Sequence, residues 1–374
     1  MKLFINATHF YNAPSGLGVY TQNIVKALLN KYKDVKVFTG NKDVGAYKHS
    51  SIVITPKCLN PRRGTSGHIL RILWEQSYLW LITLKEKPDI LFSTVHEGVA
   101  LPISGTKQVI TIHDLIAIKF PHYFKRLKYY FIHFLPIIIK NSRALICVSE
   151  STKRDLFNHY KLKDKSVYVI YPGYDRSIFF PREKKLFKDL GRYFLFVGDM
   201  RPHKNLDRLI QAVGELKQYN FKLLIAGKKD KRFYPALSNK VKEYGLEGKV
   251  VFLDYVPTEE LPYLYSCAEA LVFPSLYEGF GLPLIEAMAC GCPIITSDIP
   301  PLREVCGESA YYVNPYHKDS IAEGIYRLFM DHTLKSKLAT MGIERAKVFS
   351  WERSADEHVR VFEEITRGHY QQKP

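Results

Sequence analysis

The most informative stretch of the sequence is Tyr277-Glu278-Gly279-Phe280-Gly281-Leu282-Pro283-Leu284-Ile285-Glu286. The apolar run 270–274 before it predicts a strand, and the pattern 284–289 after it predicts a helix. Amides at a helix start, together with the helix dipole, bind anions. The stretch therefore predicts a phosphate site at residues 279–282, with Glu278 at the mouth of the strand and Glu286 about two turns into the helix. The alternative is an ordinary strand–loop–helix junction with two solvated glutamates.

A phosphate site between two carboxylates that can bind hydroxyls indicates a sugar–nucleotide ligand. Residues 273–286 also resemble the Glu-x7-Glu signature of family 4 retaining glycosyltransferases. The resemblance implies an α/β chain with the GT-B architecture, in which two Rossmann-like, doubly wound parallel-sheet domains face a central cleft. It implies that Glu278 binds hydroxyls of the donor sugar and Glu286 the ribose. The remaining donor-binding residues expected in this stretch are Gly279, Phe280, Gly281 and Leu282.

Length and pattern predict two domains. The 374 residues are 46% hydrophobic, enough for two cores. Apolar runs alternate with helical patterns in both halves, which predicts parallel sheets. A Pro/Gly connector at 171–175 marks the boundary. We expect an acceptor-side domain at 1–172, a nucleotide-sugar-binding domain at 173–349, and a helix at 350–374 that crosses back to the first domain.

The positive charge lies in the first half of the chain. Of the net +17, residues 1–170 hold 25 Lys and Arg against 10 Asp and Glu, and the remainder holds 29 against 27. Two stretches, 68–81 and 121–135, predict crossover helices, and the second mixes basic with aromatic residues. One face would pack on the sheet, and the basic flank would contact an anionic membrane surface. No apolar run is long enough to span a bilayer, so we expect a cytoplasmic chain, peripheral on the inner face of the cell membrane.

Several residues of the first half follow predicted strands, where α/β sheets bind ligands. Gly16 and Gly18 follow the first strand, and the resemblance places them on the donor side; a tight turn is the alternative. His113 follows the strand 108–112 and matches the histidine that the family places near the transferred sugar. Asp114 would orient it or cap the next loop. His96-Glu97 is a weaker prediction for acceptor contact.

The second half repeats the pattern. Arg201 and Lys204 follow the strand 192–198 and begin a helix, where a cation is unfavourable unless an anion lies nearby. They match a basic pair that binds the donor diphosphate in the family. The match is firmer for Lys204 than for Arg201, because some members place the arginine directly after the glycine, where this chain has Asp199. Gly227, Tyr255 and Val256 follow the next two strands and would hold the nucleobase, by resemblance.

These expectations combine into one mechanism. The sequence has no Asp-x-Asp pair for a metal-bound diphosphate, so we expect no metal or other cofactor, with Lys204, Arg201 and the amides of 279–282 in the place of a metal. His113, Glu278, Lys204 and Arg201 are the predicted catalytic residues. The resemblance implies retaining transfer of a hexose from a donor such as UDP-glucose or GDP-mannose to a glycan or lipid-linked acceptor in surface polysaccharide synthesis. A sugar-nucleotide epimerase and a basic nucleic-acid-binding protein are the alternatives. No nucleic-acid-binding motif is present, so nucleic acid is not an expected partner.

Overall fold

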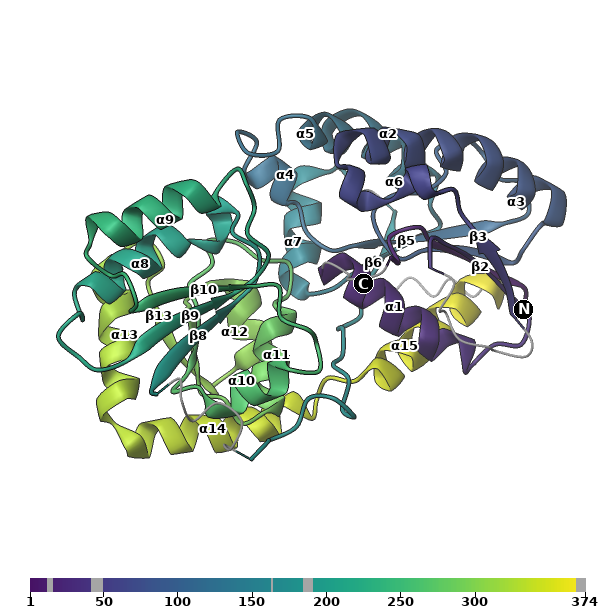
Figure 1. Ribbon diagram of the computed structural model, residues 1–374. Helices are drawn as coiled ribbons and strands as arrows, with labels where there is room; N and C mark the ends of the chain where they lie inside the picture. The colour runs from purple at the N-terminus through teal and green to yellow at the C-terminus, as the bar shows by residue number, and fades with distance from the viewer. Residues whose placement is uncertain (12–15, 42–49, 163, 184–190, 368–374) are drawn as a thin grey trace. The chain divides into compact units, whose positions relative to one another are not determined.

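A computed structural model describes residues 1–11, 16–41, 50–162, 164–183 and 191–367 (Figure 1). The chain forms two compact units. Unit 1 comprises residues 1–173 and the segment from Trp351 onward, and unit 2 comprises Tyr174–Ser350. Each unit is built on one sheet in which all strand pairs are parallel.

The sheet of unit 1 has seven strands in the order β3-β2-β1-β4-β5-β6-β7. Their bounds are β1 Leu3–Ala7, β2 Val35–Thr39, β3 Ser50–Ile54, β4 Ile90–Ser93, β5 Lys107–Ile112, β6 Ala144–Cys147 and β7 Ser166–Val169. The order reverses between β1 and β4, so the loops that follow these two strands diverge and leave room for a ligand at the carboxyl edge.

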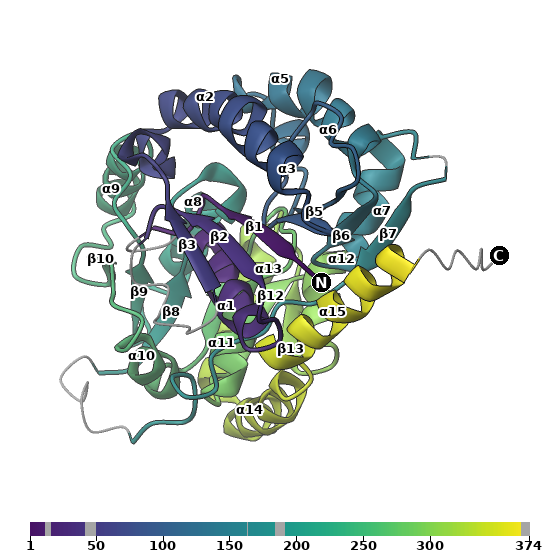
Figure 2. The ribbon, with the colours of Figure 1, turned by 90° about the vertical axis from the view of Figure 1, so that its right-hand side faces the viewer.

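The helices of unit 1 cover both faces of this sheet. They are α1 Gly16–Leu29, α2 Thr65–Trp74, α3 Trp80–Glu86, α4 Ile116–Lys119, α5 Leu127–Tyr129, α6 Leu135–Asn141, α7 Glu150–His159 and α15 Trp351–Arg367. In both views α2, α3, α5 and α6 lie on one side of the sheet, while α1 and the yellow α15 lie on the other (Figure 1, Figure 2). The predicted crossover helices therefore exist.

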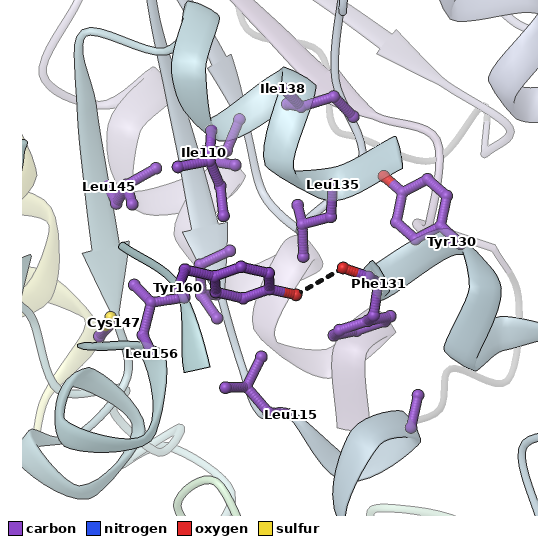
Figure 3. Packing of buried hydrophobic residues seen from close by; sticks show 13 residues of the cluster. Ile110, Leu115, Tyr130, Phe131, Leu135, Ile138, Leu145, Cys147, Leu156 and Tyr160 are labelled. Carbon is purple, nitrogen blue, oxygen red and sulfur yellow. Dashed lines mark hydrogen bonds between the residues drawn. The ribbon is translucent and has the colours of Figure 1, made fainter. Parts of the chain in front are cut away.

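The main apolar cluster of unit 1 lies between the sheet and the helices α4 to α7. Strand side chains such as Ile110 and Leu145 meet Leu135 and Ile138 of α6 and Leu156 of α7 (Figure 3). Tyr160 ends α7 inside this cluster and donates a hydrogen bond from its hydroxyl to the Phe131 carbonyl at 2.7 Å. That bond satisfies a buried polar group and fixes the end of α7 against the neighbouring helix.

Both crossover segments contain a π-turn, which the sequence analysis did not predict. Residues Glu75–Leu79 (η3) join α2 to α3, and Tyr130–Phe134 (η4) join α5 to α6. A π-turn inserts an extra residue and shifts the helical face that follows it. Helical periodicity alone does not reveal such an insertion.

The last helix, α15, belongs to unit 1. Buried residues of α15, including Phe362 and His358, pack near Phe92 of β4. The His358 Nε2 atom lies 3.2 Å from the Tyr20 hydroxyl of α1. Helix α15 thus covers the part of this face of the sheet that α1 leaves open. Residues 368–374 lie outside the described part of the chain.

The sheet of unit 2 has six strands in the order β10-β9-β8-β11-β12-β13. Their bounds are β8 Tyr193–Val197, β9 Lys222–Ala226, β10 Val250–Asp254, β11 Leu271–Phe273, β12 Ile294–Ser297 and β13 Ala310–Val313. The α-helices of this unit are α8 Leu206–Gly214, α9 Tyr234–Glu243, α10 Leu261–Cys267, α11 Leu282–Ala289, α12 Pro300–Cys306, α13 Lys318–Met330 and α14 His332–Ala346. The strand order reverses between β8 and β11, as it does between β1 and β4 of unit 1.

Two local expectations need correction. The helix after the Gly-Phe-Gly turn begins at Leu282, because Gly281 has a left-handed φ of 112°, so Glu286 lies just over one turn into α11. Gly16 and Gly18 are part of α1 and neither has a positive φ, so a tight turn does not explain them. The loop residues Pro14 and Ser15 lie outside the described part of the chain.

No described helix has the length and apolar character needed to cross a membrane.

Candidate functional site

Lys204 and Glu278 meet at the point where the strand order of unit 2 reverses. Lys204 ends a 3-10 turn, Pro202–Lys204 (η6), in the loop after β8, and Glu278 lies in the loop after β11. The Lys204 Nζ atom donates to Glu278 Oε1 at 2.6 Å, and about an eighth of each side chain is exposed. Two predicted catalytic residues, 74 positions apart in sequence, are thus in direct contact.

Backbone and side-chain hydrogen bonds hold these two loops together. The Leu276 amide donates to the His203 carbonyl at 2.7 Å. The Asn205 amide group donates to the carbonyls of Pro274 and Pro315 at 3.0 and 2.7 Å, and Asn205 has a left-handed φ of 62°. Asparagine adopts this conformation more easily than most residues. The site is therefore fixed by the fold before any ligand binds.

The charged side chains around Lys204 balance one another. Arg201 lies 3.5 Å from Asp199, and both side chains are more than two-fifths exposed. Burial alone would raise the pKa of Asp199, but the Lys204 and Arg201 cations hold it below its ordinary value. The two cations and the carboxylates of Asp199 and Glu278 sum to zero. A diphosphate that binds here would compete with these carboxylates for Lys204 and Arg201.

The start of α11 presents backbone rather than side chains. Phe280 is buried and packs edge-to-face on Phe349 with ring centroids 5.6 Å apart. Pro283 has no amide hydrogen, and the Leu284 amide donates to the Gly281 carbonyl. Leu282 is the first residue of α11, and the binding of an anion by the amides of residues 279–282 stays a prediction.

Glu286 has an environment unlike that of Glu278. It accepts a hydrogen bond at 3.2 Å from the hydroxyl of Tyr265, a buried residue of α10. Burial raises the pKa of the Glu286 carboxyl to about 8. Without a ligand this group is largely protonated at neutral pH, and a neighbouring hydroxyl donor would favour its ionised form.

Gly227 lies where three strand ends of unit 2 converge. Its amide donates to the Asp254 carbonyl at 2.8 Å, and a β-carbon here would come within 1.8 Å of the Gly198 carbonyl oxygen. Glycine is therefore required by packing. Tyr255, which is 53% exposed, and Val256 follow at the end of β10. These residues share one edge of the sheet with Lys204, and their contact with the nucleobase stays a prediction.

His113 lies at the carboxyl end of β5 in unit 1 and is nearly buried. Its Nε2 atom donates to the Thr94 carbonyl at 2.8 Å, which leaves the lone pair on Nδ1. Burial lowers the pKa of His113 to about 4, so the ring is neutral at neutral pH. Asp114 accepts the Ile116 amide and so caps the turn before α4. Among the described residues, apart from its chain neighbours and the backbone of its own helix, no atom lies within 4 Å of a β-carbon placed on Gly16.

A second polar cluster in unit 1 surrounds Glu97, which is 1% exposed. Arg71 of α2 binds it with two hydrogen bonds, from Nε at 2.7 Å and from a terminal nitrogen at 2.9 Å. His68 Nδ1 lies 2.8 Å and His9 Nε2 lies 3.2 Å from the same carboxylate. Burial would raise the pKa of Glu97, but the charge of Arg71 brings it well below its ordinary value.

The sequence analysis missed most of this cluster. It considered Glu97 but not Arg71, His68 or His9. His9 follows β1 directly, so the rule that drew attention to His113 could have found it. No sequence signal marks Arg71 or His68 on a helix. Within the described ranges, no three His, Cys, Asp or Glu side chains are arranged to hold a metal ion.

Comparison with known proteins identifies the family of the chain. A family model described as "Glycosyltransferase Family 4" matches residues 14–178, and one described as "Glycosyl transferases group 1" matches residues 178–347. The O-antigen chain mannosyltransferase RfbU of Salmonella typhimurium is 30% identical over 84% of this chain and 87% of its own length. The O-antigen chain mannosyltransferase B of Escherichia coli is 27% identical over 93% of this chain and 96% of its own length.

Solved structures show the same fold. Sucrose-phosphate synthase from Thermosynechococcus elongatus superposes with a TM-score of 0.82 at 20% identity, covering 99% of this chain and all of the other. HepE of Anabaena, solved with UDP and glucose, superposes with a TM-score of 0.75 at 17% identity, covering 97% of this chain and 99% of the other. The two parallel-sheet units are thus the Rossmann-like domains of the GT-B fold, and the chain belongs to the family 4 glycosyltransferases.

Proposed function

We propose that this glycosyltransferase moves a hexose from a nucleoside-diphosphate sugar to a glycan or lipid-linked glycan, with retention of configuration and without a metal. The contact between Lys204 and Glu278 at the strand-order reversal of unit 2 carries the proposal. A cation and a carboxylate held together are suited to a ligand whose diphosphate adjoins a hydroxyl-rich sugar. The relatives named as mannosyltransferases favour GDP-mannose as the first donor to test, and UDP-glucose as the second.

The proposed reaction breaks the bond between the anomeric carbon and the diphosphate oxygen. Lys204, Arg201 and the amides of 279–282 neutralise the charge that develops on the departing diphosphate. Glu278 accepts hydrogen bonds from hydroxyls of the transferred sugar, and Glu286 binds the ribose. His113 accepts from a sugar hydroxyl through Nδ1. The acceptor hydroxyl attacks from the face that the diphosphate leaves, and the diphosphate takes its proton.

A panel of nucleotides and nucleotide sugars tests the donor assignment. We expect one diphosphate and its sugar derivative to raise the melting temperature of the full chain, because a ligand that binds only the folded state stabilises it. Lys204→Met should abolish the shift, and Lys335→Met, which removes a cation paired with Glu269 elsewhere in unit 2, should preserve it. If no nucleotide gives a shift, or if Lys204→Met gives the normal one, the donor site is wrong. A donor-only incubation that yields an epimerised nucleotide sugar would instead support the epimerase alternative.

We further propose that unit 1 docks on an anionic membrane. The helices that cover one face of the sheet in unit 1 expose a patch of large apolar residues. Basic residues of the same segments accompany them. The apolar members, each at least 44% exposed, are Ile69, Leu73, Leu81, Tyr123, Tyr129 and Ile132. The segment 115–149 contains six Lys and Arg and no Asp or Glu. The rings of His68 and Tyr130 lie 4.9 Å apart, so the α2 and η4 segments are neighbours.

Apolar and aromatic side chains flanked by cations fit the boundary between headgroups and acyl chains. Each cation near such a surface contributes about 1 kcal/mol. A lipid-linked acceptor would be presented at this surface, on the cytoplasmic face where anionic lipids are enriched.

Vesicle sedimentation tests the membrane proposal. The chain should bind vesicles of phosphatidylglycerol and phosphatidylcholine but not pure phosphatidylcholine, and salt should weaken the binding. The double substitution Lys125→Glu, Arg126→Glu should abolish binding. The matched change Lys217→Glu, Lys222→Glu in unit 2 should leave it intact. Equal binding to both vesicle types, or retained binding by the unit 1 variant, would contradict the proposal.

A further inference from the structure

Asp199 is an acidic residue beside the two cations that the proposed function assigns to the donor diphosphate. It comes after Gly198, the first residue beyond β8, and its Oδ1 atom accepts the amide of Arg201 at 3.1 Å. Its Oδ2 atom lies 3.5 Å from the Arg201 Nε atom. The Lys204 side chain passes the same point, because a β-carbon placed on Gly198 would lie 3.9 Å from Lys204 Cε. A negative charge therefore stands where an anion is proposed to bind.

The loop after β9 places a second ion pair next to this one. Asp230 accepts hydrogen bonds from the Arg232 amide at 2.9 Å and from the Arg232 guanidinium at 2.9 and 2.6 Å. The loop begins at Gly227, where a β-carbon would lie 3.8 Å from the Asp199 amide nitrogen. The loops after β8 and β9 are therefore neighbours at the carboxyl edge of the sheet.

Asp199 is ionised at neutral pH and interacts with cations of both loops. Burial raises the pKa of Asp199, but the charges of Lys204 and Arg201 bring it below its ordinary value. The hydrogen bonds from Arg232 lower the pKa of Asp230 to about 2, and the charge of Arg201 adds to this effect. Pairing with Asp230 raises the pKa of Arg232, and the charge of Asp199 raises it further. The Asp199 carboxylate is thus a charged group close to three cations.

The property of Asp199 that needs an explanation is its charge. An asparagine would also offer an oxygen to the Arg201 amide, so the local turn does not require a carboxylate. A carboxylate opposes the binding of an anion to Lys204 and Arg201, and the repulsion grows in proportion to the charge of that anion. Asp199 therefore distinguishes between ligands that differ in charge.

The proposed reaction changes the charge of the diphosphate. The bond between the anomeric carbon and the diphosphate oxygen breaks, its electron pair stays on that oxygen, and the acceptor oxygen forms the new bond to the anomeric carbon. The freed diphosphate oxygen takes the proton of the acceptor hydroxyl. Because a terminal phosphate has a second pKa of about 6, this proton passes to water at neutral pH. The nucleoside diphosphate thus carries about one negative charge more than the nucleotide sugar.

We propose that Asp199 is a specificity-determining residue that disfavours the released nucleoside diphosphate relative to the nucleotide sugar. Its carboxylate repels the more highly charged product more strongly than the donor, which lowers product inhibition. The proposal rests on the proposed function, because it concerns the same diphosphate cations. The alternative role for Asp199 is to orient Arg201 toward the diphosphate, and in that role the carboxylate would strengthen diphosphate binding.

Calorimetry at pH 8 and low ionic strength measures the sign of the effect. Asp199→Asn should bind GDP or UDP about tenfold more tightly than the natural chain, and GDP-mannose or UDP-glucose about fivefold more tightly, because the gain scales with the charge of the ligand. Both gains should shrink in high salt, since the Asp199 side chain is 44% exposed. Weaker diphosphate binding by Asp199→Asn, or an equal gain for donor and diphosphate, would overturn the proposal.

Asp298→Asn is the matched control. Asp298 follows β12 of the same sheet and accepts a hydrogen bond from Arg303 at 2.8 Å, and both side chains are 49% exposed. It is thus an aspartate–arginine pair like that of Asp199 and Arg201, but without a cation assigned to the diphosphate. Asp298→Asn should bind every probe as the natural chain does. A gain equal to that of Asp199→Asn would reflect net charge alone and would contradict the proposal.

Inorganic pyrophosphate separates this proposal from the proposed function, because it has neither base nor sugar. Asp199→Asn should bind pyrophosphate about tenfold more tightly than the natural chain does. If this gain is seen while no nucleotide sugar binds, the proposed function fails and the charge selection by Asp199 stands. If nucleotide sugars bind and Asp199→Asn gains no affinity for diphosphates, only the role of Asp199 fails. If no probe binds either protein, both fail.

Discussion

At the residue scale, the contact between Lys204 and Glu278 changes how the opening motif is understood. Glu278 and Glu286 are alike in the sequence but differ in surroundings: Glu278 is paired with a cation, whereas Glu286 is held by a tyrosine hydroxyl and has a raised pKa. Their positions were predictable because Glu278 lies in the loop after β11 and Glu286 in the helix that follows this loop. Their partners were not, because Lys204 and Tyr265 are distant in sequence and only the folded sheet brings them near.

Lys204→Met should reduce the transfer rate by about 10²–10³-fold, as expected when a group that stabilises developing charge is lost. Lys204→Arg should recover part of the rate, because it restores the cation with a different shape. Initial rates of nucleoside diphosphate release, with circular dichroism as the control for folding, measure both. A near-normal rate in Lys204→Met would show that Lys204 does not act on the leaving group.

Glu286 predicts a pH-dependent donor affinity. Its pKa of about 8 means that raising the pH from 6 to 8.5 converts a neutral carboxyl into a carboxylate, the better acceptor for two ribose hydroxyls. GDP-mannose or UDP-glucose should therefore bind more tightly at pH 8.5 in calorimetry, and Glu286→Gln should remove this dependence. If the donor affinity rises equally with pH in the natural chain and in Glu286→Gln, Glu286 is not the source of the pH dependence.

Gly16 offers a test of close approach by the donor. Ala is more stable than Gly by about 0.5–1 kcal/mol in the middle of a helix and by less at the first residue, where Gly16 lies. Among the described residues, no atom beyond its chain neighbours and the backbone of its own helix lies within 4 Å of a β-carbon placed on Gly16. Gly16→Ala should therefore raise the melting temperature slightly while lowering donor turnover. Gly227→Ala should destabilise the chain, because its β-carbon would collide with the Gly198 carbonyl. Unchanged turnover in a stabilised Gly16→Ala variant would remove Gly16 from the donor side.

At the scale of elements, apolar runs identified the strands of both sheets, because strands buried on both faces are continuously hydrophobic. The exact ends of the helices were less predictable than the positions of the strands. The start of α11 depends on the left-handed conformation of Gly281, and the π-turns η3 and η4 depend on packing against the sheet. The burial of Arg71 on α2 was also hidden, since a charged residue in a helical pattern ordinarily indicates the solvated face.

The attachment of α15 to α1 gives a matched pair of substitutions. Tyr20→Phe removes the partner of the buried His358 Nε2 and should lower the free energy of unfolding by about 1–3 kcal/mol. Lys31→Ala breaks the exposed ion pair between Lys31, in the turn after α1, and Asp356 of α15, and should cost less than about 1 kcal/mol. Urea unfolding of the two variants measures how much free energy of unfolding each substitution costs. Equal losses would mean that the Tyr20–His358 contact does not anchor α15.

At the scale of the whole molecule, the two sheets reverse their strand order in the same way, and each places a glutamate close to a nitrogen-bearing side chain there. In unit 2 the Lys204 cation contacts Glu278, and in unit 1 His9 Nε2 lies 3.2 Å from Glu97. The excess positive charge belongs to the half of the sequence that forms most of unit 1. Composition predicted this asymmetry, and the resemblance to the family predicted the fold. Neither revealed the Glu97 cluster, because buried polar networks follow from tertiary contacts and not from local pattern.

Transfer of sugar from a labelled donor decides whether the chain is a hexosyltransferase. The chain is incubated with GDP-mannose or UDP-glucose labelled in the sugar, together with lipid-linked and free oligosaccharide acceptors. We predict that label from one donor enters a glycan product with equimolar release of nucleoside diphosphate, and that Glu278→Ala, correctly folded, forms none. Product formation at a near-normal rate by Glu278→Ala, or donor consumption without a new glycoside, would contradict the account.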